Sequence, residues 1–192
     1  MEIEELLKEI RTCNKCSSCL PLGPAPLLTA SSRSRIVVIG QAPGVKAHES
    51  RIPWNDASGK QLRKWMGVSD EVFYNPEIIA LVPMGFCYPG KGKSGDLPPR
   101  PECALSWHEE LQKQMPNKEL ILLVGNYAQR YYLKGRHKNL TETVKSYHSY
   151  LPQFFPIVHP SPNSRFWLSK NRWFVEEVVP VLQQEIQKII KR

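Results

Sequence analysis

The sequence has no long hydrophobic run, and no stretch approaches the roughly 18 apolar residues of a membrane-spanning helix. Its first residues, MEIEELLKEIRTC, have neither the basic start nor the apolar centre of a secretory signal. The sequence also lacks internal repeats and long low-complexity segments. These absences predict a cytoplasmic protein without a membrane partner, folded as a single domain over residues 1–192.

Acidic residues are in the minority. The chain has 26 Lys and Arg against 18 Asp and Glu, so its formal net charge is +8. A basic surface favours polyanionic partners, because each phosphate that it neutralises releases condensed counterions. Charge alone does not separate a nucleic-acid-binding protein from an ordinary basic protein. The 41% hydrophobic and 23% charged residues are typical of a globular domain with a core of its own.

Five cysteines without a secretory signal argue against a disulfide framework and favour metal or redox chemistry. Cys13 and Cys16 form a C-x-x-C pair, and 15 residues separate Cys87 from Cys103. Four thiolates in two groups can form a tetrahedral zinc site or a Cys₄ iron–sulfur cluster. Cys19 extends the pair to C-x-x-C-x-x-C and could replace one ligand. The alternative is a set of unrelated thiols.

Predicted helices and strands alternate along the chain. Short runs that are apolar or β-branched predict strands at 35–40, 78–84, 119–125 and 154–159. Helical spacing predicts helices at 2–11, 58–66, 102–115, 126–133 and 173–190, the last one interrupted by Pro180. Strands separated by helices predict βαβ crossovers and an α/β fold with a mainly parallel sheet.

Functional side chains are expected at the carboxyl ends of the strands of such a sheet. The segments found there are GQAPG (40–44), GFCYPGKGKSGDLPPRP (85–101), GNYAQ (125–129) and HPSPNSRFW (159–167). Residues 88–101 are predicted to form a loop because they are rich in Gly and Pro. We therefore expect the functional site where these four segments meet.

GQAPG after the first strand, a PW pair a few residues later and HPS near the end resemble the motifs of the uracil-DNA glycosylase superfamily. The sequence is most similar to the iron–sulfur (family 4 type) glycosylases. Their first motif is usually GEGPG or GEAPG, a C-x-x-C pair precedes it at a similar distance, and their other cysteine pair has the same interval. The resemblance extends in order from about Cys13 to Trp167.

This resemblance implies a three-layer α/β/α fold with a central four-stranded, mainly parallel sheet. It also implies a [4Fe–4S] cluster, with zinc or no metal as the alternatives. The implied ligands are Cys13, Cys16, Cys87 and Cys103, with Cys19 left out.

The implied function is DNA repair. Such an enzyme flips uracil or a related damaged base out of DNA and hydrolyses its N-glycosidic bond, without a catalytic lysine intermediate. DNA is the implied partner, and the protein is expected to be a monomer. The alternative is a non-catalytic module with the same fold that binds DNA or senses damage.

The motifs also imply roles for single residues. His159 is expected to donate a hydrogen bond that stabilises the departing base. Backbone groups of the 40–44 turn, including Gly40 and Ala42, are expected to contact the base or a phosphate. Trp54 is expected to stack on the base, and Asn55 offers an amide for its recognition.

Two positions depart from the family pattern. Gln41 stands where the family has an acid, and an amide cannot act as a general base, although it can orient a water. His48 and Glu49, followed by Asp56, are the candidates for the missing charge. Pro83 stands where the family places an Asn that recognises the edge of uracil, so the base specificity does not follow from the motifs.

Basic and apolar side chains follow HPS. The family uses this segment as a wedge in the duplex, and its basic and apolar residues here are Arg165, Phe166, Lys170 and Arg172. Ser161, within HPS, is also expected to contact DNA. The alternative is a solvated basic loop. Phosphate contacts are expected from Lys91, Lys93 and Arg100 in the loop before Cys103.

Overall fold

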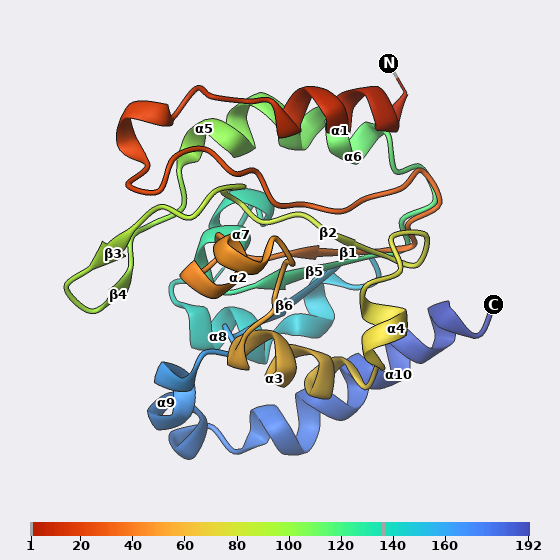
Figure 1. The fold of residues 1–192 in the computed structure, drawn as a ribbon. Coiled ribbons are helices and arrows are strands. Elements are labelled where there is room, and N and C mark those ends of the chain that lie inside the picture. The colour runs from red at the N-terminus through yellow and green to blue at the C-terminus, as the bar shows by residue number, and fades with distance from the viewer. Residues whose placement is uncertain (1, 136) are drawn as a thin grey trace.

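A central sheet between two layers of helices forms the structure, a computed structural model that describes residues 2–135 and 137–192 (Figure 1). The strands are β1 (Ile36–Ile39), β2 (Ile79–Leu81), β5 (Leu120–Val124) and β6 (Phe154–Ile157). They lie in the order β2-β1-β5-β6, and all three pairs are parallel. The predicted α/β fold with a four-stranded parallel sheet is confirmed, and each strand is shorter than its apolar run.

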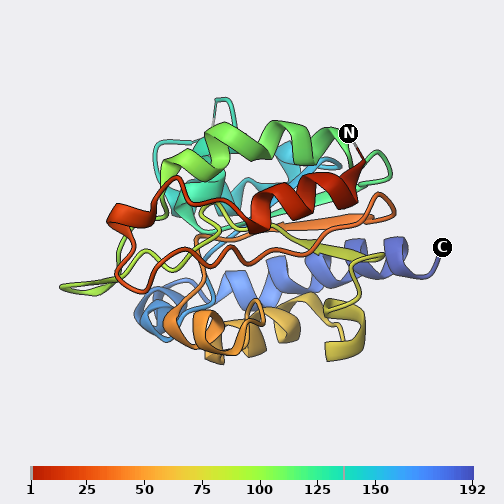
Figure 2. The same cartoon turned by 45° about the horizontal axis from the view of Figure 1, so that its top comes forward.

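The two faces of the sheet belong to two separate hydrophobic cores. Alternate residues of β1 enter alternate cores, Ile36 and Val38 on one face and the residues between and after them on the other. One core packs against α3 (Ala57–Met66) and α10 (Val179–Ile190), and the other against α1 (Ile3–Arg11). Figure 2 shows the sheet between these layers. Burial on both faces explains why the strands are continuous apolar runs.

Several helices are short. They are α2 (Val45–Ser50), α4 (Asp70–Phe73), α7 (Asn126–Tyr132), α8 (Leu140–Lys145) and α9 (Arg165–Lys170). Of these only α7 was predicted, because one or two turns are too short to show a helical period. Side-chain caps support two of the others: Ser69 accepts from the N–H of Val72, and Asn139 from that of Glu142. Within the described residues, no helix is long and apolar enough to cross a membrane.

Wide turns of π type divide the two longest predicted helices. The 102–115 prediction corresponds to α5 (Pro101–Cys103), a π turn (Ala104–His108) and α6 (Glu109–Lys113). The predicted interruption near Pro180 is a second π turn (Phe174–Val178), and Pro180 itself lies in the first turn of α10. Proline has no N–H for the helical ladder, so the irregular turn directly before it accommodates the missing bond.

The prediction of a loop at 88–101 is wrong at its centre. There, β3 (Lys91–Gly92) and β4 (Gly95–Asp96) pair as an antiparallel hairpin, which projects from the body of the molecule (Figure 1). Gly90 and Gly95 have φ values of +104° and +127°, a region that glycine adopts without strain. The high glycine content correctly predicted a turn. The strand pairing across this turn was missed, because a strand of two residues has no recognisable sequence pattern.

Candidate active site

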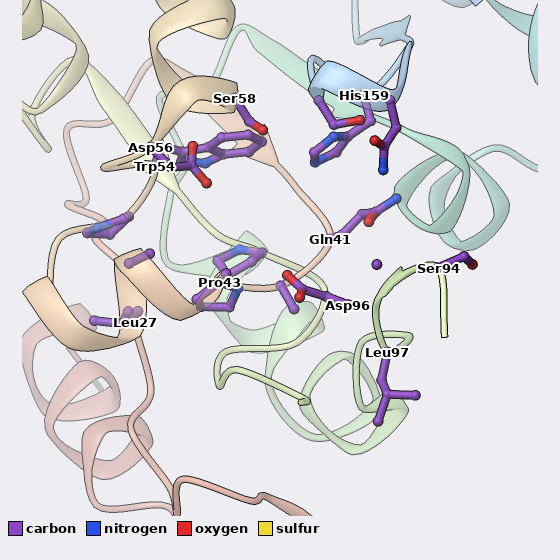
Figure 3. Close-up of a pocket in the computed structure, with 18 residues that line it drawn as sticks. Leu27, Gln41, Pro43, Trp54, Asp56, Ser58, Ser94, Asp96, Leu97 and His159 are labelled. Atoms are coloured by element: carbon purple, nitrogen blue, oxygen red, sulfur yellow. The ribbon is translucent and has the colours of Figure 1, made fainter. Parts of the chain in front are cut away.

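A cavity of about 370 Å³ lies at the carboxyl ends of the strands. Its walls come from the turn after β1, the loop before α3, the β3–β4 hairpin and the segment after β6 (Figure 3). Three of the four predicted segments therefore line one space, and the fourth, which begins at Gly125, packs behind it. This volume lies in the usual range of small-molecule pockets.

His159 follows β6 and lines the cavity half-buried. Its ring stacks on that of Trp54, with ring centroids 5.8 Å apart and an angle of 27° between the planes. The hydroxyl of Ser164 donates a 2.6 Å hydrogen bond to its backbone carbonyl. Burial lowers the pKa of His159 to about 4, against the opposing charge of Asp56. The ring is therefore neutral near pH 7 and presents one N–H donor.

Trp54 forms part of the cavity wall in an unusual backbone conformation, with φ of +57°. This left-handed region is strained for a bulky residue and is kept only where the surroundings enforce it. Arg63 and the hydroxyl of Tyr74 both donate to the Trp54 carbonyl, each at 3.4 Å. A Cβ on Gly40 would lie 2.6 Å from the indole ring, and one on Gly59 would lie 1.8 Å from the Trp54 carbonyl oxygen. Two glycines thus permit the indole to occupy this position.

Gln41 lines the cavity on the same side as His159 (Figure 3). Its backbone carbonyl accepts a 2.9 Å hydrogen bond from the N–H of Gly85, which ties the turn after β1 to the segment after β2. A Cβ on Gly125 would lie 3.3 Å from Gln41 Nε2 and 3.4 Å from His159 Cβ. Gly125 therefore packs against both side chains, and its φ of +85° is a conformation that glycine adopts without strain.

Two carboxylates also line the cavity, Asp56 and Asp96. Asp56 caps α3, and its Oδ1 accepts a 2.8 Å hydrogen bond from the N–H of Gly59. Asp96 comes from β4 of the hairpin. Sequence reasoning ranked Asp56 behind two other candidates and missed Asp96, for which the only local signal was an acid after Ser-Gly in a glycine-rich loop.

Comparison with protein-family models matches residues 28–183 to the Uracil DNA glycosylase superfamily. The chain belongs to this superfamily. The match includes all four strands of the sheet and every segment that lines the cavity except Leu27. Membership assigns the uracil-DNA glycosylase fold and a function of the DNA glycosylase type with DNA as its substrate; it specifies neither a subfamily nor a base.

Four of the residues predicted for catalysis or base binding do not line the cavity: Gly40, His48, Glu49 and Asn55. His48 is buried beside Tyr88, and its Nδ1 has no hydrogen-bond partner among the described residues. Glu49 and Asn55 are exposed. Since Ala47 faces the cavity and an α-helix turns about 100° per residue, the next two side chains of α2 point elsewhere.

The segment predicted to contact DNA starts at the cavity and continues along the surface. Ser161 lines the cavity, whereas Arg165, Phe166 and Lys170 are exposed on α9. Phe166 is 70% exposed, and the Lys170 ammonium lies 4.2 Å from the centroid of its ring. Arg172, just after the helix, is also exposed. An exposed aromatic ring with adjacent cations suits contact with bases and phosphates.

Of the four predicted ligands, Cys16, Cys87 and Cys103 are buried and Cys13 is half-buried, and Cys16 and Cys87 pack in one small hydrophobic cluster. Burial is the main cause that raises the pKa of the Cys103 thiol to about 11, and the charges of the other three contribute to the rise. The backbone N–H groups of Ala25 and Phe86 donate to the sulfur atoms of Cys87 and Cys103, both at 3.4 Å. Cys19 is exposed.

The arrangement of these thiols bears on the kind of metal that they could bind. Within residues 2–135 and 137–192, no group of three or more His, Cys, Asp or Glu side chains is placed to hold a metal ion. A zinc site requires every sulfur within about 2.3 Å of one ion. A four-iron cluster binds each thiolate at a different iron, so its sulfur atoms lie further apart. Four thiols with backbone N–H donors to two of the sulfur atoms fit the donor set of such a cluster.

His108 supports the cavity from behind, and sequence reasoning missed it. Its Nε2 lies 3.1 Å from the carbonyl oxygen of Pro83, which lines the cavity, and its Nδ1 lies 2.7 Å from the hydroxyl of Tyr132. A carbonyl only accepts, so Nε2 carries the proton and the neutral ring accepts at Nδ1 from Tyr132. Burial lowers the pKa of His108 to about 4.

This buried histidine predicts a stability that depends on pH. The unfolded chain binds a proton at His108 below about pH 6.5 and the folded chain only below about 4, so the free energy of unfolding falls as the pH drops between these values. From pH 7 to pH 5 we expect a loss of about 2 kcal/mol from this residue. Urea unfolding at both pH values measures it.

The matched variants are His108→Gln and His148→Gln, since His148 is exposed. The first should be less stable at pH 7 and lose less stability on acidification, and the second should behave like the wild type. An unchanged loss in His108→Gln would contradict the prediction.

Proposed function

We propose that this protein is a monofunctional, monomeric DNA glycosylase that hydrolyses the N-glycosidic bond of uracil or a related damaged base. The observation that carries the proposal is the pairing of a neutral His159 with the ring of Trp54 in the wall of a cavity at the carboxyl ends of the strands. A base inside a duplex is reached only by flipping its nucleotide into such a pocket.

The residues of the cavity support a simple hydrolysis. The flipped base lies against the wall formed by Trp54 and His159, and the His159 N–H donates to a base oxygen that gains negative charge as the glycosidic bond breaks. A water then supplies the oxygen for the anomeric carbon. Among the described residues that line the cavity there is no lysine, which favours a water nucleophile over a covalent amine intermediate.

A second candidate function rests on two residues of the cavity wall. Gln41 carries no charge, and Pro83 offers no side-chain hydrogen bond where related enzymes recognise uracil. Both features favour a protein that binds a flipped base without releasing it. The base preference of an active enzyme would then depend on other groups of the cavity. One of them is the amide of Gln41, which lines the cavity.

A base-release assay separates the two functions. Oligonucleotides with uracil, hypoxanthine, xanthine or an oxidised pyrimidine, single- and double-stranded, are incubated with the protein, and the free base is measured. Release from one of them supports the glycosylase. Retained binding to a lesion without release from any of them would support the non-catalytic module.

We further propose that α9 and the residues around it enter the duplex beside the flipped nucleotide. The exposure of Phe166 and the cations at Arg165 and Lys170 support this role. Side chains of this kind wedge between base steps and contact the adjacent phosphates. Ser161 lines the cavity, so the segment that it begins starts beside the proposed position of the flipped base.

We also propose that Cys13, Cys16, Cys87 and Cys103 hold a [4Fe–4S] cluster. The similarity to iron–sulfur glycosylases and the N–H donors to two of the sulfur atoms support it. When bound, the cluster would supply covalent links between the N-terminal segment and the loop that carries the hairpin. These cysteines would then stabilise one wall of the cavity without taking part in hydrolysis.

Loss of one ligand should remove the cluster. The purified protein is expected to be brown, with broad absorbance near about 400 nm, and Cys103→Ser is expected to lose this absorbance together with the iron. Cys19→Ser is the matched control and should keep both, because Cys19 is exposed and outside the proposed ligand set. A colourless wild type with one zinc per chain would contradict the proposal.

A further inference from the structure

Two carboxylates from separate parts of the chain meet above one glycine of the first motif. Asp56 lies in the loop before α3, and Asp96 lies in the β3–β4 hairpin. A Cβ built on Gly44 would be 3.7 Å from Asp56 Oδ2 and 3.6 Å from Asp96 Oδ2. Figure 3 shows both side chains in the cavity, together with Gln41 and His159. The cavity that has an amide at Gln41 therefore contains two carboxylates from other segments.

The two carboxylates have different surroundings. Asp56 is held by the N-terminus of α3, since its Oδ1 accepts the N–H of Gly59. Its charge reaches His159, whose pKa it raises against the effect of burial. Asp96 forms no salt bridge within the described part of the chain. Burial and the charge of Asp56 raise the pKa of Asp96, whereas Lys91 and the hydroxyl of Tyr88 lower it. Asp56 Oδ1 accepts the N–H of Gly59, but no backbone N–H of the described residues donates to the Asp96 carboxylate, so Asp96 is the better placed of the two to accept a proton.

The hairpin gives Asp96 a defined place. Asp96 pairs with Lys91 in the antiparallel register, and the N–H of Leu97 donates a 2.8 Å hydrogen bond to the carbonyl of Gly90. These bonds close the hairpin at its base. Backbone pairing therefore fixes the position of residue Asp96 in the cavity wall, and the residue is exposed to solvent.

We propose that Asp96 is the general base of the hydrolysis and that Asp56 is a fixed negative charge beside the sugar. The assignment rests on the proposed glycosylase function. A water oxygen bonds to the anomeric carbon while Asp96 accepts the water proton, and the bond from that carbon to the base nitrogen breaks. The electron pair leaves with the base, whose oxygen accepts the His159 N–H, and the base then takes a proton from solvent.

Asp96→Asn tests the base directly. The amide has the same shape and cannot accept the proton, so single-turnover release should fall by about 10²- to 10⁴-fold. Binding of the same DNA should change little. The matched control is Glu71→Gln, which removes one exposed carboxylate on α4 and should release base at the wild-type rate. Circular dichroism and thermal unfolding check that both variants fold.

A binding measurement gives a second readout that needs no turnover. DNA with a cationic pyrrolidine in place of the damaged nucleoside imitates the charge that develops on the sugar, and DNA with a neutral tetrahydrofuran lacks it. Two nearby carboxylates should make the wild type prefer the cation. Asp96→Asn should reduce this preference about tenfold or more, whereas Glu71→Gln should keep it.

The outcomes separate the two proposals. Release by Asp96→Asn at the wild-type rate would overturn the role of Asp96 and leave the glycosylase function intact. A second outcome is that the wild type releases no base and still prefers the cationic DNA in a way that depends on Asp96. This result would overturn the glycosylase function and would support the position of the carboxylates beside the sugar. Absence of both release and preference would overturn both.

Discussion

Replacement of His159 by alanine is expected to slow base release by about 10²- to 10³-fold, the usual effect of removing one donor to a developing oxyanion. Alanine has no side-chain N–H, so the donor that lies beside the ring of Trp54 is lost. Single-turnover release on the best substrate measures the effect. His159→Gln keeps an N–H donor and should retain more activity than His159→Ala.

The pH dependence of the rate adds a second test of His159. Its pKa of about 4 keeps the ring neutral in the folded protein above that value. Titration of His159 should therefore cause no inflection of the rate near pH 6.5. The pH profiles of the wild type and of His159→Ala should have the same shape in that range. His148→Ala, an exposed histidine in the 3₁₀ turn Tyr147–Tyr150, should match the wild type. Unchanged release by His159→Ala would remove the donor role.

Gly59→Ala is expected to destabilise the protein by about 3–5 kcal/mol, a large effect for one methyl group. The added Cβ would lie 1.8 Å from the carbonyl oxygen of Trp54, which Arg63 and Tyr74 hold in place. A backbone oxygen cannot move away as the end of a flexible side chain does. The first turn of α3 and the loop with Trp54 must therefore separate, and urea unfolding measures the cost.

Lys60→Ala is the control for Gly59→Ala. Lys60 is the next residue of α3 and is exposed, so its replacement should change the free energy of unfolding by less than about 0.5 kcal/mol. The fluorescence of Trp54 should change in Gly59→Ala and stay the same in Lys60→Ala. If Gly59→Ala were as stable as the wild type, the close approach of α3 to Trp54 would be incorrect.

The fold followed from the sequence to a large extent. All four strands were predicted because each is buried on both faces and appears as a continuous apolar run. Their parallel arrangement followed from the helices between them. The short helices α2, α4, α8 and α9 were missed, since their stability comes from caps and packing rather than from a periodic pattern.

The site was predicted in part. Residues that belong to local motifs were found, and residues that only the fold brings to the cavity were missed. His159, Trp54 and Gln41 belong to local motifs, and all three line the cavity. His48 and Glu49 were chosen because they are near Gln41 in the sequence, but the rotation of α2 carries them away from it. Asp96 is 55 residues from Gln41 and lines the same cavity.

The sequence by itself determined the layers of this protein, the motif order of its family and the two cysteine groups, because these depend on neighbouring residues and on burial. Only the tertiary structure decided which charged groups face the base. Asp96 reaches the cavity through a two-residue strand pair, and Asp56 through the cap of α3. Such contacts depend on the meeting of distant segments, which no local pattern records.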